Sequence, residues 1–138
     1  MTDAEELLER WFTSFNSGDY ATTLDCMADD VEYHELPGFP GARGGGSTPG
    51  VYCGKEEVVA WYVDFLAGWE SIASEPSTIT DLGEGHVVAE ETWRGRGAQS
   101  GVDVEMHAAS LFTIREGRIA RVEYFRDRAE ALAAIRGP

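Results

Sequence analysis

The sequence predicts an α+β fold, in which N-terminal helices pack inside a curved, mixed and mostly antiparallel sheet that forms a cone-shaped barrel. Two patterns point to this class. Apolar residues recur at helical spacing up to residue 28 and again over residues 55–69, and they alternate at period two from residue 72 almost to the C-terminus. With 138 residues the chain has room for one core, so we expect a single domain over residues 1–138.

Two helices are expected first. Between Thr2 and Asn16 the apolar residues at helical spacing are Leu7, Leu8, Trp11, Phe12 and Phe15. After Ser17-Gly18 breaks this pattern, Asp19 caps a second helix, which we expect to end at Asp29-Asp30.

The stretch from Asp29 to Gly38 is typical of a half-buried strand, because it alternates apolar and polar residues and stops at Pro-Gly. In such a strand Val31, Tyr33 and Glu35 project from one face. A carboxylate on an apolar face costs free energy unless it is solvated, hydrogen-bonded or neutral. Glu35 is therefore the first candidate for a catalytic residue.

Residues 37–50 are rich in Gly and Pro, so we expect a mobile surface loop that acts as a lid over a pocket. The stretch from Gly41 to Thr48 has the glycine spacing of a phosphate-binding loop. It lacks the lysine of such loops, and no apolar strand leads directly into it, so the lid is the favoured interpretation.

A third helix begins after Gly54, and its broad apolar face consists of Val58, Trp61, Tyr62, Phe65, Leu66 and Trp69. Four strands and a short closing helix are expected to follow, over residues 72–81, 86–96, 102–115, 118–126 and 128–135. In the third of these strands one face consists of Met106, Ala108, Ser110, Phe112 and Ile114. The opposite face carries Ala109 and Leu111, and such exposed apolar surface predicts a two-fold dimer.

The formal net charge of −14 argues against nucleic acid and anionic membranes as partners. The N-terminal segment resembles neither a secretory signal nor a membrane anchor, and no later stretch has the length of a membrane span, so we expect a cytoplasmic protein. Cys26 and Cys53 have no C-x-x-C spacing and are expected to be reduced thiols.

Four stretches together resemble the NTF2-like superfamily, in its SnoaL-like and ketosteroid-isomerase-like branch, and the likeness covers nearly the whole chain. They are Phe15-Asn16-Ser17-Gly18-Asp19, Ala28 to Glu35, Gly54-Lys55-Glu56-Glu57-Val58 and Phe112 to Ile119. The resemblance implies an apolar cone, pairing through the outer face of the sheet, and acid/base chemistry on an apolar carbonyl compound without a cofactor. The reaction would be an isomerisation or a polyketide-cyclase-like ring closure.

Carried over residue by residue, the resemblance places Glu35 at the carboxylate that shuttles a proton, and Tyr62 at a pocket tyrosine. Trp11 and Ser110 stand where ketosteroid isomerases have an oxyanion tyrosine and a second, protonated acid, and both can donate hydrogen bonds. The arginine and aspartates of the limonene-epoxide-hydrolase branch correspond to Glu91, Trp93 and Tyr124, which makes an epoxide hydrolase the less favoured activity.

The predicted ligand is a small apolar organic molecule, in a pocket formed by Trp11, Phe15, Tyr33, Tyr62, Phe65, Trp69, Trp93, Ser110, Tyr124 and Arg126. Arg126 is included because it shares strand parity with Tyr124. No metal is expected, since His34, Glu35 and His107 would have to converge from both faces of the sheet. Two alternatives stay open: Glu35 at an ordinary solvated strand end, and a binding or association module without chemistry.

Overall fold

The computed structural model describes residues 1–35 and 50–136 of the chain. The helices are α1 (Asp3–Ser17), α2 (Tyr20–Asp25), α3 (Gly54–Ala67) and α4 (Arg128–Arg136). The strands are β1 (Met27–His34), β2 (Val51–Cys53), β3 (Trp69–Gly83), β4 (His86–Gly97), β5 (Asp103–Arg115) and β6 (Arg118–Phe125). The lid and the phosphate-loop alternative both fall on residues outside the described ranges.

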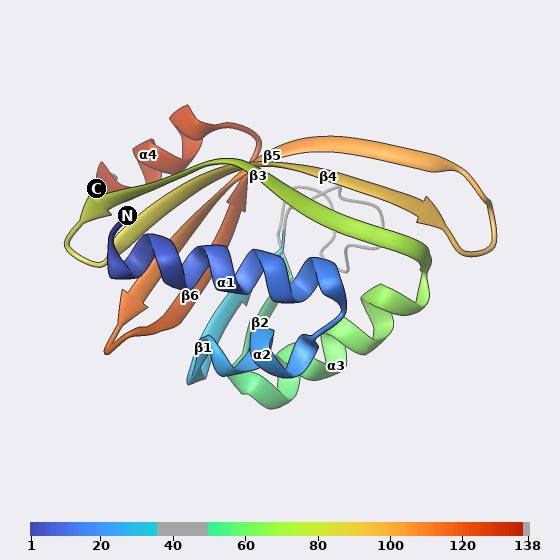
Figure 1. The fold of residues 1–138 in the computed structure, drawn as a ribbon, viewed down its shortest axis with the longest axis horizontal. Coiled ribbons are helices and arrows are strands. Elements are labelled where there is room, and N and C mark those ends of the chain that lie inside the picture. The colour runs from blue at the N-terminus through green and yellow to red at the C-terminus, as the bar shows by residue number, and fades with distance from the viewer. Residues whose placement is uncertain (36–49, 137–138) are drawn as a thin grey trace.

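The described strands form one sheet in the order β2-β1-β6-β5-β4-β3. Only the β1–β6 pair is parallel, so the sheet is mixed and mostly antiparallel, as expected. It curves around α1, with α3 beside it and α4 on the opposite face (Figure 1). The α+β class is confirmed, but β2 and β3 are separate edges in the described residues, so the sheet is not closed into a barrel.

The first helix begins and ends where its capping residues predict. Thr2 accepts a hydrogen bond from the Glu5 amide while the Glu5 carboxylate accepts one from the Thr2 amide, which completes a capping box. Gly18 ends the helix in the left-handed conformation, with φ of 83°. The apolar stripe between these ends is buried, and Leu8, Trp11 and Phe12 reach the centre of the core.

Several boundaries differ from the expectation. The second helix ends at Asp25, because Met27 already pairs with Ile119 of β6 and is fully buried. The strand β2 was not expected, since three residues are too few to show a period. β3 begins at Trp69 and tolerates Pro76 because it is an edge strand whose register shifts at that point.

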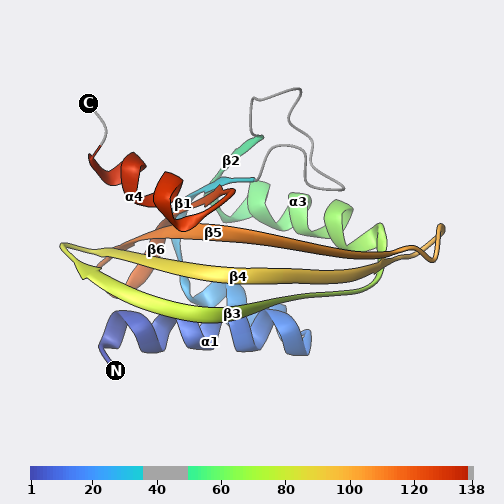
Figure 2. The same cartoon turned by 90° about the horizontal axis from the view of Figure 1, so that it is seen from above.

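Part of the outer face of the sheet, at one end, is covered by α4 (Figure 2). Ala109 and Leu111 of β5 form a buried cluster there with Val88 of β4 and Ala131 of α4. The expectation that Ala109 and Leu111 present exposed apolar surface was wrong, because the closing helix buries both. The apolar residues that are exposed instead include Val51 on β2, Val59 and Val63 on α3, and Val102 before β5.

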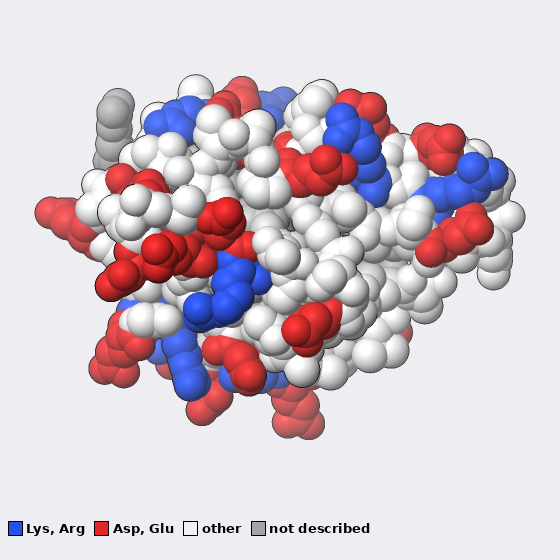
Figure 3. Space-filling model, viewed as in Figure 1, with Lys and Arg blue, Asp and Glu red and all other residues white. Residues whose placement is uncertain are grey.

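Charged side chains, many of them acidic, are spread over the surface shown in Figure 3. Ion pairs connect β4 to its two neighbouring strands. Arg94 contacts Glu75 of β3 and Glu105 of β5, and Arg96 contacts Glu70 of β3 and Asp103 of β5. Among the helices of the described residues, none combines the length and the apolar character that a membrane span requires.

Candidate functional site

A layer of aromatic rings fills the concave side of the sheet. Its members contact one another in an unbroken chain of ring pairs and are all buried: Phe15, Tyr33, Trp61, Tyr62, Phe65, Trp93 and Tyr124. The ring centroids of Tyr33 and Tyr124 are 5.7 Å apart, and those of Trp93 and Tyr124 are 6.0 Å apart. The structure thus brings together most of the predicted pocket side chains as this aromatic layer.

Glu35 lies at the edge of the aromatic layer. It follows β1 directly, only 3% of its surface is exposed, and its amide donates to the Gly50 carbonyl at 3.0 Å. Carboxylate oxygen Oε2 accepts a hydrogen bond from the Trp61 indole Nε1 at 2.9 Å. The Trp61 ring in turn packs on Tyr33, with centroids 4.7 Å apart. The carboxylate is therefore held by one ring of the layer.

Gly50 fits closely against this carboxylate. A Cβ atom added at Gly50 would overlap Glu35 Oε1 and would lie 3.0 Å from the Tyr52 hydroxyl. Only glycine therefore leaves the Glu35 carboxylate in its present position.

A second buried acid, Glu91 of β4, was not proposed from the sequence. Only 3% of Glu91 is exposed, and the Ser74 hydroxyl donates a short hydrogen bond to its Oε2. Burial raises the pKa of Glu91 to about 7, against a smaller lowering by the Ser110 and Ser74 hydroxyls. Near neutral pH this carboxyl group is therefore partly protonated, and the neutral form can donate a hydrogen bond.

One buried donor of the concave side, Trp11 Nε1, has no hydrogen-bond partner among the described residues, whereas the Ser110 hydroxyl is close enough to the Glu91 carboxyl to lower its pKa. Trp11 packs against Phe12 and Phe112, with centroids 5.0 and 5.3 Å away. An unpaired buried polar atom costs about 1–3 kcal/mol, so the Trp11 indole N–H calls for an explanation.

The tyrosines of the aromatic layer stay neutral. The Tyr33 hydroxyl donates to the Tyr124 hydroxyl at 3.0 Å. Burial raises the pKa of both phenols well above its ordinary value, and the charge of Glu91 adds to the increase in each. Burial likewise raises the pKa of Tyr62.

Two predicted pocket residues lie away from the centre of the layer. Trp69, at the start of β3, is partly buried, and its ring lies beside Phe65 of the layer with centroids 6.1 Å apart. Arg126 is exposed and forms an ion pair with Glu130, with Nη2 and Oε1 2.6 Å apart. The parity argument fails for Arg126 because β6 ends at Phe125.

The histidines also have other partners. His34 Nε2 lies 3.1 Å from Glu32 Oε1, and His107 Nδ1 lies 3.0 Å from the Thr92 hydroxyl. Among the described residues, no group of His, Cys, Asp and Glu is arranged to hold a metal ion.

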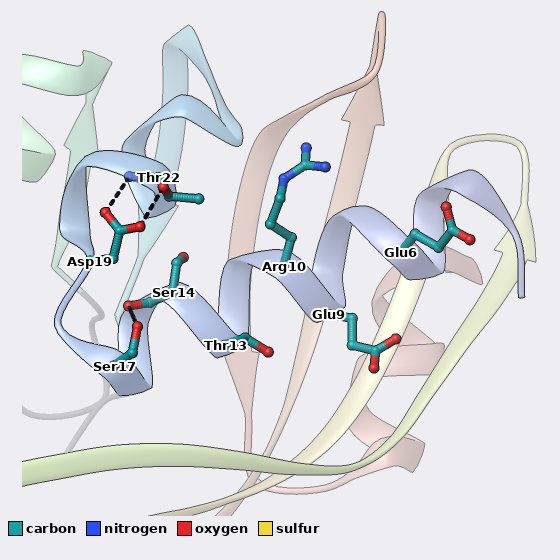
Figure 4. Close-up of a pocket in the computed structure, with 8 residues that line it drawn as sticks. All are labelled: Glu6, Glu9, Arg10, Thr13, Ser14, Ser17, Asp19 and Thr22. Atoms are coloured by element: carbon teal, nitrogen blue, oxygen red, sulfur yellow. Dashed lines mark hydrogen bonds between the residues drawn. The ribbon is translucent and has the colours of Figure 1, made fainter.

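A polar groove of about 410 Å³ lies on α1 and the start of α2, away from the aromatic layer (Figure 4). It is lined by Glu6, Glu9, Arg10, Thr13, Ser14, Ser17, Asp19 and Thr22. The Asp19 carboxylate accepts hydrogen bonds from the amide and the hydroxyl of Thr22, and the Ser17 hydroxyl donates to the Ser14 carbonyl. Because these groups cap and brace the helices, the groove is a weaker candidate than the aromatic layer.

The family model for the SnoaL-like domain matches residues 8–122, which is most of the chain. The chain belongs to the SnoaL-like family. This assignment confirms the NTF2-like resemblance, and within this SnoaL-like protein the matched region includes both Glu35 and Glu91. A comparison with curated proteins found no match.

Solved structures show the same fold at low sequence identity. An NTF2-like protein of unknown function from Burkholderia pseudomallei is 19% identical, with a TM-score of 0.78 over 99% of this chain and 100% of that one. TerC, co-crystallised with polyporic acid, is 18% identical with a TM-score of 0.77 over 99% and 100%. A protein from Catenulispora acidiphila with a ketosteroid-isomerase-like fold, in complex with trimethylamine, is 17% identical with a TM-score of 0.72 over 96% and 94%.

Proposed function

We propose that this SnoaL-like protein is an enzyme that binds a small apolar carbonyl compound against the aromatic layer and moves a proton on it without a cofactor. Glu35 is the general base. One observation carries the proposal: a carboxylate that is almost fully buried among aromatic rings, with one oxygen fixed by the Trp61 indole. A carboxylate in such surroundings is positioned for proton transfer to and from a carbon next to a carbonyl group.

The proposed reaction needs only the groups of this chain and the ligand. The Glu35 carboxylate takes a proton from the carbon beside the carbonyl, and the electron pair of that C–H bond moves to the carbonyl oxygen as an enolate. Return of the proton to another carbon gives an isomer. Attack of the same carbon on a second carbonyl instead forms the C–C bond of a ring, and Glu35 returns its proton to the resulting alkoxide. The Trp61 hydrogen bond orients the carboxylate throughout, and the rings hold the apolar body of the ligand.

The alternative is a binding module that holds the same kind of molecule without chemistry. Two structural neighbours support a small-molecule ligand in either case, since TerC was crystallised with polyporic acid and the Catenulispora protein with trimethylamine. The two functions differ in what Glu35 does: a base exchanges protons with the ligand, whereas a carrier has no such requirement. The cytoplasmic location expected from the sequence stays a prediction.

The experiment uses 2-tetralone, a bicyclic ketone with acidic protons beside its carbonyl group, in D₂O. We expect the wild-type protein to accelerate loss of the α-proton NMR signal. Glu35→Gln keeps the shape of the side chain but removes the base, so the exchange rate should fall by about 100-fold or more while the Kd for 2-tetralone changes little. Glu32→Gln is the matched control, because Glu32 lies on β1 with its side chain 43% exposed.

A Glu35→Gln variant that exchanges as fast as the wild type would contradict a base at this position. Tight binding of 2-tetralone without exchange by the wild-type protein would favour the carrier instead.

A further inference from the structure

An aromatic ladder, formed by Trp61, Phe65 and Trp69, runs from the Glu35 carboxylate to the end of α3. The first two residues belong to α3 and the third follows its last turn, so a spacing of four residues places the rings one above another. The rings of Trp61 and Phe65 are stacked with centroids 4.8 Å apart, and the Phe65 and Trp69 centroids are 6.1 Å apart. Because the Trp61 indole binds Glu35, the ladder connects the proposed base to the partly buried Trp69.

The far end of the aromatic ladder lines a groove of about 370 Å³. The groove lies between the C-terminal end of α3 and the hairpin of β4 and β5, which projects past α3 (Figure 1). Its apolar lining consists of Phe65 and Trp69 of the ladder together with Val102 and Val104 of the hairpin. Since Phe65 also belongs to the aromatic layer, the groove continues the apolar surface of that layer outward.

The strand register turns the groove toward the same side of the sheet as the aromatic layer. Val104 is opposite Gly95, and Gly95 alternates with the buried Trp93 on the concave face of β4. A Cβ atom added at Gly95 would lie 2.8 Å from the Trp69 ring. The Trp69 ring therefore packs directly on the backbone of β4, which fixes the last ring of the ladder in the groove.

The exposure and the shape of the groove favour a flexible apolar occupant. The exposed fraction of Val102 is 58%, so apolar surface is open to solvent at the outer end of a surface that begins in the buried core. The planes of Trp61 and Phe65 differ by 13°, but those of Phe65 and Trp69 differ by 51°. A flat, rigid ring system cannot follow this turn, whereas a saturated chain can, because it rotates about each of its bonds.

We propose that the groove binds an unbranched alkyl tail of the ligand, so that the substrate class is a carbonyl compound with such a tail. The carbonyl end lies at Glu35, and the tail runs along the aromatic ladder to Val102. The carbonyl end rests on the proposed function, whereas the tail rests on the ladder and the apolar lining of the groove. Burial of each CH₂ group of the tail against these side chains favours binding.

The test compares 2-tetralone with 6-hexyl-2-tetralone, which carries an unbranched tail on the side of the rings remote from the carbonyl group. Calorimetry measures the ratio of the two Kd values. We expect the tail to tighten binding to the wild type by about 30-fold, the scale for partial burial of the chain. Val102→Asp places a charge at the outer end of the groove, so the gain should fall below about threefold while the Kd for 2-tetralone is unchanged.

Leu82→Asp is the matched control for Val102→Asp. Leu82 is also an exposed apolar residue, but it lies at the opposite end of β3 from Trp69. The substitution adds the same charge to the protein, and the gain from the tail should stay at about 30-fold. NMR supplies a direct readout, because the terminal methyl group of the bound tail should show nuclear Overhauser effects to the methyl groups of Val102 and Val104.

The tail groove and the proposed base can fail separately. Glu35→Gln should keep the gain from the tail, so a gain without proton exchange supports the groove and contradicts the base. Exchange of 2-tetralone without any gain from the tail overturns the groove and leaves the base in place. A gain that Val102→Asp does not reduce, tail contacts elsewhere in the protein, or a wild type that binds neither compound also overturns the proposal. A second copy of the chain in the groove would likewise remove the gain, and Val102→Asp would then lower the mass measured by light scattering.

Discussion

At the scale of the residue, the contact between Glu35 and Gly50 gives a direct test of positioning. Gly50→Ala places a Cβ atom where Glu35 Oε1 now lies, so the carboxylate must shift. Because displacement of a catalytic group by about 1 Å can cost about 100-fold, we expect the 2-tetralone exchange rate to fall by about 10- to 100-fold. The NMR exchange assay measures it.

Gly68→Ala is the control for Gly50→Ala. A Cβ at Gly68 would meet only the Phe65 carbonyl at 3.6 Å, an ordinary contact, and the residue has right-handed φ and ψ angles. Both substitutions restrict the unfolded chain alike, so the difference between them reports on Glu35. Equal exchange rates in the two variants would show that the carboxylate position does not matter.

The two buried carboxyl groups also show which site residues could be predicted from the sequence. Glu35 was singled out because it shares a strand face with Val31 and Tyr33, and the structure buries it. The same argument applies to Glu91, which alternates with Ala89 and Trp93, and it would have found the second acid had it been applied there. Trp61 was assigned to the apolar helix face, but its indole bond to Glu35 depends on how α3 packs beside β1, which spacing within a helix does not determine.

At the scale of the element, α4 covers the apolar part of the outer face of the sheet. Ala131 is fully buried against Val88, Ala109 and Leu111, so Ala131→Glu would force a carboxylate into an apolar contact. We expect a loss of about 2 kcal/mol or more in the free energy of unfolding, or undocking of α4 with increased binding of an apolar fluorescent dye. Urea unfolding and dye fluorescence measure the two effects.

Ala133→Glu is the control for Ala131→Glu, because Ala133 lies on the exposed side of the same helix. It should stay within about 0.5 kcal/mol of the wild type. Equal stability of the two variants would mean that α4 does not cover the sheet in solution.

Helices and strands with a long apolar repeat were predicted correctly, whereas segments whose structure depends on pairing with another strand were not. The faces of β5 were assigned correctly, with Phe112 toward the main core and Leu111 away from it. The turn between β5 and β6 is made by Glu116 and Gly117, whose positive φ angles of 53° and 76° suit a tight hairpin. Met27 lies within the segment that was predicted as the second helix. It belongs to a strand because it pairs with β6, which the local sequence does not show.

At the scale of the whole molecule, a two-fold dimer stays a prediction, but the surface expected to form its interface is a different one. Ala109 and Leu111 are buried under α4, so pairing would use exposed apolar residues elsewhere, such as Val59 and Val63 of α3. Light scattering at micromolar concentration should give about twice the chain mass of 15.1 kDa. Val63→Glu should shift the protein toward the single chain, whereas a wild-type mass of one chain would contradict the dimer.

The free energy of unfolding of the whole protein should depend on pH through the protonation of Glu91. Its carboxyl has a pKa of about 7 when folded and about 4.5 in an exposed reference state, so the folded protein binds the extra proton between these values. Stability is therefore lost as the pH rises from about 5 to 8, by about 3 kcal/mol, and is kept below that window.

Glu91→Gln removes this titration while leaving the rest of the surface charge, which is strongly negative in both proteins. Urea unfolding of the two proteins at pH 5 and pH 8 measures the effect, and the charge common to both cancels in their difference. We expect the stability of the variant relative to the wild type to rise by about 3 kcal/mol between pH 5 and pH 8, because only the wild type must bury an ionised carboxylate at the higher pH. A difference that is the same at both pH values would mean that burial in the folded protein does not raise the pKa of Glu91.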